Sequence, residues 1–212
     1  MRVLILVDIQ NDFVPGGALG VREGNLVVPV ANRVQQAFAG AGDVIVATQD
    51  WHPPDHGSFA ANHPGRSVYD VIDLHGLRQV LWPVHCVQGS PGAAFVADLD
   101  VSRVRRIFQK GTDPAIDSYS GFFDNGHRKD TGLGDYLKQQ GVRDVYVCGL
   151  ATDYCVKFTV LDAIQLGFRT HVIEDACRGV NVNPGDADAA VEEMRRAGAK
   201  VMQSGDLVGI RR

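Results

Sequence analysis

The sequence predicts an α/β fold in which a mostly parallel sheet of about six strands carries helices on both faces. Apolar runs without alternation, such as Val3 to Val7, are typical of strands that are covered on both sides. These runs alternate along the chain with stretches in which apolar residues recur every three or four positions, the spacing of amphipathic helices. Alternating strands and helices indicate a parallel sheet with right-handed crossovers.

Each element follows from one of these two patterns. We expect strands at 3–7, 43–48, 104–109, 144–148, 170–173 and 199–202. We expect helices at 24–39, 133–140, 153–166 and 186–197, each followed closely by a glycine: Gly40, Gly141, Gly167 and Gly198. The sequence contains no internal repeat or linker, so we expect one domain over residues 1–212.

The composition restricts the class of protein. With 45% hydrophobic and 22% charged residues among 212, the chain is not generally disordered. The net charge of -4 argues against a nucleic-acid partner, and no apolar stretch approaches the roughly 18 residues of a membrane span. We therefore expect a cytoplasmic protein with no membrane partner, whose assembly into a homo-oligomer is left open. The cysteines lack the number and spacing of a disulfide scaffold and are expected to be thiols: Cys86, Cys148, Cys155 and Cys177.

Three residues with chemically active side chains follow predicted strands. They are Asp8, Lys110 and Cys155, and parallel strands would bring them to one edge of the sheet. Cys155 would lie in the first turn of a helix, where free N–H groups, the helix dipole and a nearby lysine favour a thiolate. An adjacent carboxylate could accept the thiol proton and later protonate a leaving group. The three residues therefore suggest a cysteine nucleophile with an acid–base partner.

Each of these residues also has an ordinary structural interpretation. A single cysteine is more often a small buried apolar residue than a nucleophile. An aspartate at the end of a strand often caps a helix, and a lysine there is usually solvated. Spacing alone does not decide between the two interpretations.

The segment 50–85 breaks the alternation and carries a second group of candidates. It holds five of the seven histidines and four prolines with little periodicity, and a long irregular segment in a compact domain is usually functional. Asp50 and His52 point to the same side of an extended segment, and His85 can close a site that suits a divalent transition metal. Three other histidines of the segment are interpreted as solvated or as supporting residues rather than ligands: His56, His63 and His75.

The motifs resemble those of the isochorismatase-like hydrolases and, within that family, of the nicotinamidases or pyrazinamidases. The matching segments follow the family's order over 8–155. They are 8–13 (DIQNDF), 15–17 (PGG), 48–53 (TQDWHP), 56–59 (HGSF), 82–87 (WPVHCV), 110–111 (KG), 119–122 (YSGF) and 149–155 (GLATDYC). The resemblance implies a hydrolase of pyridine nucleotide salvage that converts nicotinamide to nicotinate and ammonia through a cysteine thioester, and that also acts on pyrazinamide.

The resemblance also implies roles for individual residues of the reaction centre. Asp8, Lys110 and Cys155 would form the catalytic triad. The backbone N–H groups of Ala151 and Cys155 would form the oxyanion hole, next to a cis peptide bond between Leu150 and Ala151.

The same resemblance implies a metal site and an aromatic pocket. Asp50, His52 and His85 would bind one divalent ion, zinc, iron or manganese, and Ser58 would reach it through a water molecule. The aromatic side chains that would bind the substrate ring are Phe13, Trp82 and Tyr119, the first two by stacking on its faces. The pyridine nitrogen would face the metal, which would turn the carboxamide toward the cysteine.

Two other functions stay open at this point. A different cysteine amidase of the same fold, acting on an N-carbamoyl or ureido compound, would use a similar aspartate, lysine and cysteine. A thiol or metal protein without turnover would show thiol oxidation but no hydrolysis. Isochorismatase activity itself is disfavoured, because the family members with that activity lack the nucleophilic cysteine that Cys155 supplies.

Overall fold

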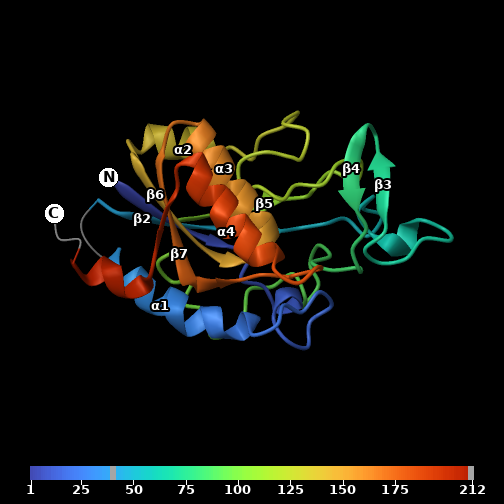
Figure 1. Cartoon of the computed structure of the whole chain (residues 1–212), viewed down its shortest axis with the longest axis horizontal. Helices are drawn as coiled ribbons and strands as arrows, with labels where there is room; N and C mark the ends of the chain where they lie inside the picture. The colour runs from blue at the N-terminus through green and yellow to red at the C-terminus, as the bar shows by residue number, and fades with distance from the viewer. Residues whose placement is uncertain (39–41, 210–212) are drawn as a thin grey trace.

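The central feature of the computed structural model is a six-stranded parallel sheet, and the structure describes residues 1–38 and 42–209 (Figure 1). The strands lie in the order β5-β2-β1-β6-β7-β8. Their bounds are β1 Arg2–Val7, β2 Val44–Asp50, β5 Arg106–Lys110, β6 Asp144–Leu150, β7 Arg169–Arg178 and β8 Lys200–Met202. The predicted fold class and all six predicted strands are confirmed.

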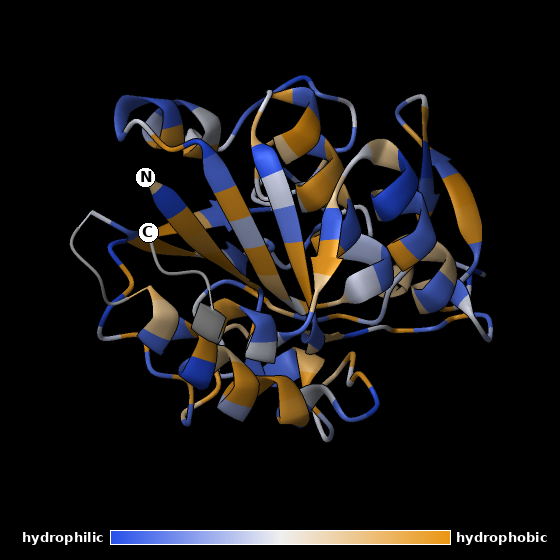
Figure 2. Cartoon of the chain, turned by 60° about the vertical axis from the view of Figure 1, so that its left-hand side comes forward, coloured by the Kyte–Doolittle hydropathy of each residue, from blue (hydrophilic) through white to orange (hydrophobic). Residues whose placement is uncertain are grey.

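Helices cover both faces of the sheet. The α-helices within residues 1–38 and 42–209 are α1 Val27–Ala37, α2 Leu133–Gln139, α3 Lys157–Gln165 and α4 Asp186–Ala197. Figures 1 and 2 show α1 and the C-terminal turn Ser204–Gly209 on one face and the other three helices on the opposite face. In the part of the chain that the structure describes, no helix is long and apolar enough to cross a membrane.

Burial on both faces explains why the strand sequences do not alternate. Val3 to Val7 of β1 are fully buried, and every residue of β2 is buried. Figure 2 shows that β1 is hydrophobic along most of its length. A strand between two helical layers has no solvated side on which polar residues would be stable.

The strand order determines where a site can form. From β1 the chain passes through α1 to β2, whereas β6 pairs with the other side of β1. A crevice opens beyond the carboxyl ends of the strands where the order reverses in this way. The register aligns those ends, since Val7 pairs with Gly149 and Asp50 pairs with Lys110.

The expectation of an irregular segment at 50–85 needs correction. The segment 50–85 is not structureless, because it contains the short helical turn Ala60–Asn62 and an antiparallel hairpin, β3 Val71–Leu74 and β4 Leu77–Val80. Its two-residue turn, His75 and Gly76, has positive φ at both positions, and the sequence lacks the Asn-Gly or Asp-Gly pair that usually marks this turn. Figure 1 shows the hairpin standing apart from the central sheet.

Two predicted helices begin with a different kind of turn. Residues 24–26 form a 3-10 turn before α1, and Thr152–Val156 form a π-helical turn before α3. The predicted end of the first helix, at Ala39 and Gly40, lies outside the described residues.

Candidate active site

Lys110, at the end of β5, lies at the centre of the candidate site. Its ammonium Nζ is 2.9 Å from Asp8 Oδ2 and 2.6 Å from Asp50 Oδ1. It also donates to the Ser118 carbonyl at 2.9 Å and to Cys155 Sγ at 3.4 Å. The strands therefore bring together the three predicted catalytic side chains, each of which is buried.

The two carboxylates that share Lys110 have different affinities for a proton. Burial raises the pKa of Asp8, and the opposing charge of Lys110 does not reverse the shift. Burial also acts on Asp50, but Lys110 and His52 hold its pKa well below the ordinary value. Asp50 is therefore the permanent anion of the pair, whereas Asp8 can take up and release a proton.

The ionisation state of Cys155 differs from the sequence-based expectation, which was a thiolate. Cys155 lies in the π-helical turn Thr152–Val156, as expected for the start of a helix. Burial raises the pKa of its thiol well above the usual value, with Lys110 acting in the opposite direction and Asp8 adding to the rise. The buried sulfur therefore keeps its proton when no substrate is bound, and a base must remove this proton when the sulfur attacks.

The backbone before Cys155 has the expected form. The peptide bond between Leu150 and Ala151 is cis, and Ala151 lines the same pocket as Cys155. The use of the Ala151 and Cys155 N–H groups as an oxyanion hole stays a prediction.

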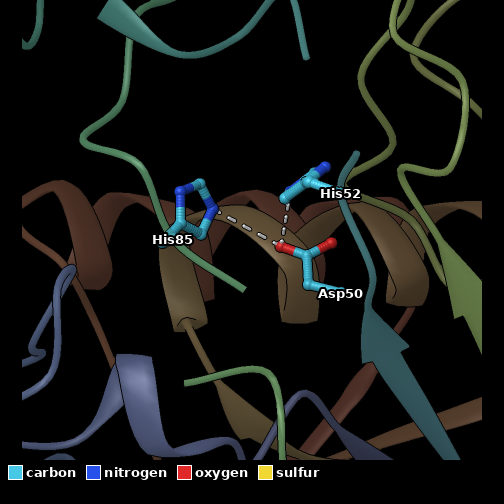
Figure 3. Close-up of side chains that lie close together, drawn as sticks. All are labelled: Asp50, His52 and His85. Carbon is cyan, nitrogen blue, oxygen red and sulfur yellow. Dashed lines mark ion pairs between the residues drawn. The ribbon is translucent and has the colours of Figure 1, made fainter. Parts of the chain in front are cut away.

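A metal-ligating group lies on the other side of Asp50. Asp50 Oδ2 is 3.3 Å from His52 Nε2 and 3.7 Å from His85 Nε2, so both rings face one carboxylate oxygen (Figure 3). The other ring nitrogen, Nδ1, is hydrogen-bonded to a backbone carbonyl in both residues. The partner is the Gly111 carbonyl for His52 and the Pro83 carbonyl for His85. When a ring is neutral with its hydrogen on Nδ1, its Nε2 presents a lone pair to an ion, as metal-bound histidines do. The three residues thus fit a divalent transition metal.

Of the two interpretations given for His56, solvated or supporting, the structure excludes the solvated one. His56 is fully buried, Nδ1 lies 2.7 Å from Ser58 Oγ, and Nε2 has no hydrogen-bond partner among the described residues. Burial lowers its pKa to about 4, so the ring is neutral near pH 7. His56, His52 and Asp117 offer ligand atoms within 4.8 Å of one another, and Asp117 was missed by the sequence analysis. His75 is exposed as expected, whereas His63 is half-buried and its Nε2 lies 2.8 Å from the Gly57 carbonyl.

An aromatic pocket leads to Cys155. The predicted side chains Phe13, Trp82 and Tyr119 all line it, together with Asp50 and His85. The sequence analysis did not assign four further lining residues to it: Leu19, Asp117, Tyr154 and Val180. Tyr154 stands edge-on to the Trp82 ring at 4.7 Å between centroids, and its place directly before the cysteine was the available signal. The pocket is narrow, with a free volume of about 20 Å³.

The fold and the site together define the class. They describe a parallel α/β protein with a buried cysteine, lysine and aspartate beside a group of residues that could hold a metal ion. The chain belongs to the isochorismatase domain family, whose model matches residues 2–206.

The relatives narrow the class further. The chain is 51% identical to the nicotinamidase of Escherichia coli (strain K12) over 205 residues, which cover 97% of this chain and 96% of that protein. A solved structure described as Acinetobacter baumanii nicotinamidase pyrazinamidease has a TM-score of 0.93 and 46% identity, with 97% of both chains covered. The pyrazinamidase of Pyrococcus horikoshii, solved in complex with zinc, has a TM-score of 0.78 and 42% identity and covers 95% of this chain and 98% of its own.

Proposed function

We propose that this protein is a nicotinamidase, which hydrolyses nicotinamide to nicotinate and ammonia and also accepts pyrazinamide. The observation that carries the proposal is the buried group in which Lys110 contacts Asp8, Asp50 and Cys155 at an aromatic pocket. The nicotinamidases of E. coli and A. baumanii, at 51% and 46% identity over nearly the whole chain, support the same substrate.

Substrate binding would use the aromatic walls of the pocket. Phe13 and Trp82 would stack on the two faces of the pyridine ring, and Tyr119 would close the side of the pocket. The hydroxyl of Tyr119 accepts a hydrogen bond from Trp82 Nε1 at 3.1 Å, which fixes the indole plane for stacking. A ring held in this way presents its carboxamide to Cys155.

The acylation step transfers one proton between two buried groups. Asp8 Oδ2 takes the thiol proton as Cys155 Sγ forms a bond to the amide carbon. The backbone N–H groups of Ala151 and Cys155 would stabilise the oxygen anion that develops. Asp8 then gives its proton to the amide nitrogen, the carbon–nitrogen bond breaks, and ammonia leaves. Lys110 keeps a positive charge beside both carboxylates throughout, since Asp50 and Asp8 outweigh its burial and raise its pKa well above the usual value.

The deacylation step reverses the proton transfer with water in place of the thiol. Asp8 takes a proton from a water molecule whose oxygen attacks the thioester carbon. The carbon–sulfur bond breaks, the proton returns from Asp8 to Cys155, and the nicotinic acid that forms releases its own proton to water and leaves as nicotinate. The raised pKa of both groups favours this exchange of one proton.

The residues that would hold a metal are Asp50, His52 and His85. We propose zinc, in line with the zinc complex of the Pyrococcus horikoshii pyrazinamidase, although iron or manganese also suits a carboxylate with two imidazoles. The ion would supply a Lewis acid for the lone pair of a ring nitrogen or a water molecule. Ser58 would contact it through water, and its contact with His56 keeps the hydroxyl oriented.

Ammonia release tests the function. The purified protein should release ammonia from nicotinamide and pyrazinamide, and the Cys155→Ala variant should bind metal but release none. Faster release from N-carbamoyl or ureido compounds would instead support the other cysteine amidase. Thiol oxidation without release from any of these compounds would support the non-catalytic alternative.

The proposal extends to the organisation and location of the chain. We propose one domain over residues 1–212, in which the segment 50–85 carries the metal ligands. We also propose a cytoplasmic location, which is consistent with the four cysteines being free thiols.

A further inference from the structure

Thr48 contacts Asp8 from the neighbouring strand, although neither the sequence motifs nor the mechanism assigns it a role. It lies in β2, and its side chain is fully buried. Its hydroxyl Oγ1 donates to Asp8 Oδ1 at 2.6 Å. Thr48 is absent from the lining of the aromatic pocket, and the partner of its hydroxyl is Asp8.

This contact gives the two oxygens of Asp8 different surroundings. Oδ1 accepts the hydrogen bond from Thr48, whereas Oδ2 lies 2.9 Å from Lys110 Nζ. Among the described residues, Oδ2 has no hydrogen bond of good geometry. Oδ2 therefore has more lone-pair capacity left for a proton than Oδ1, and the hydroxyl on Oδ1 opposes a rotation that would exchange the two.

The Thr48 side chain is itself held in one orientation. A Cβ added to Gly121 would lie 2.6 Å from Thr48 Cγ2, so the Gly121 backbone packs directly on that methyl group. Gly121 is fixed at both ends, because its N–H donates to Thr159 Oγ1 at 2.9 Å and its carbonyl accepts from Thr131 Oγ1 at 2.6 Å. A β-branched side chain has few rotamers, and a blocked methyl position leaves the hydroxyl directed at Asp8.

We propose that Thr48 is a positioning residue for the amidase reaction, which holds Asp8 Oδ1 so that Oδ2 exchanges the proton with the Cys155 thiol and the leaving nitrogen. The inference rests on the proposed function, in which Asp8 carries that proton. It predicts an effect on the chemical step without an effect on substrate or metal binding, because Thr48 contacts neither.

Two matched pairs of variants separate the hydroxyl from the packing of the methyl group. Thr48→Val replaces the hydroxyl by a methyl in the wild-type shape, and Thr48→Ala differs from Thr48→Ser only by the hydroxyl. We expect kcat for nicotinamide to fall about ten- to hundredfold in Thr48→Val and Thr48→Ala, the effect of losing a hydrogen bond to a charged group. We expect Thr48→Ser to stay within about threefold of wild type, with KM within about twofold in all variants. Metal content, measured by mass spectrometry, should be unchanged.

The outcomes distinguish the inference from the function on which it rests. Equal kcat in Thr48→Ser and Thr48→Ala, or wild-type kcat in Thr48→Val, overturns the role of Thr48 while leaving the amidase intact. A wild-type protein that releases no ammonia overturns the proposed function itself. If Thr48→Val does not fold, the serine and alanine variants still decide the question.

Discussion

Replacing Lys110 with methionine removes the cation that lies between two buried carboxylates. Methionine keeps the apolar stem, so the change is confined to the contacts of Nζ with Asp8 at 2.9 Å and with Asp50 at 2.6 Å. With an effective dielectric constant of about 20, each contact corresponds to roughly 6 kcal/mol of Coulomb energy before the desolvation of the lysine is subtracted. Removing one partner of a buried ion pair usually destabilises a protein by about 3–5 kcal/mol, and we expect that loss here.

The pH dependence of stability should differ between the variant and the wild type. In the wild type, burial alone would raise the pKa of Asp50, but Lys110 and His52 hold this pKa well below 3.8. The stability that the ionised Asp50 contributes is therefore present above pH 3.8 and is lost as the pH falls below 3.8 and through the lowered pKa. Without Lys110, Asp8 and Asp50 repel each other and their pKa values rise, so acid protonates one of them and relieves the repulsion. The stability difference between the two proteins should therefore shrink from about pH 7 to pH 5.

Urea denaturation at both pH values measures this difference. The proteins should be depleted of metal with a chelator, because an ion on Asp50 would replace part of the missing charge. Lys110→Arg keeps the charge and serves as the control, with a smaller loss at about pH 7. A methionine variant as stable as wild type at neutral pH, or one whose deficit grows in acid, would refute the reasoning.

Three further predictions concern the metal and the thiols. His52→Ala should lose the metal while keeping the circular dichroism spectrum of the wild type, and unchanged metal content would exclude this ligand. Burial raises the pKa of Cys177 to about 12 from 9.0, so its contribution to stability is complete below pH 9.0 and lost as the pH rises toward 12. Between pH 9.0 and 12, the free energy of unfolding, measured by urea titration, should therefore fall less in Cys177→Ala than in the wild type. An equal fall in the two proteins would contradict the raised pKa of Cys177. Iodoacetamide should label Cys155 before the other three cysteines in the native protein, and slowly, because it is the cysteine that lines the pocket but its buried thiol keeps its proton at rest; earlier labelling of another cysteine, identified by peptide mass spectrometry, would contradict this.

The strands and the positions of the candidate catalytic residues were predictable because they follow from short-range patterns and strand ends. The unalternated run Val3 to Val7 indicates a strand with two covered faces, and the residue after it must lie at the carboxyl edge. The same reasoning places Lys110 and Cys155 at that edge, where the structure has Lys110 contacting both Asp8 and Cys155.

The features that were not predictable depend on burial, which the sequence does not state. The helix start and the nearby lysine indicated a thiolate at Cys155, but dehydration of the sulfur outweighs them. His56 resembles an ordinary loop histidine in sequence, and only the folded chain shows that it is fully enclosed. The contact of Thr48 with Asp8 joins residues 40 positions apart, and nothing in either local sequence indicates it.

The alignment of strand ends has a consequence for how the protein acquires activity. Asp8, Asp50, Lys110 and Cys155 come from four different strand ends or turns and meet only when β1, β2, β5 and β6 are all paired. A fragment that lacks one of these strands cannot hold the complete reaction centre. Recovery of turnover during refolding should therefore coincide with completion of the last long-range strand pairing, and hydrolysis of nicotinamide becomes a sensitive reporter of the fully assembled sheet.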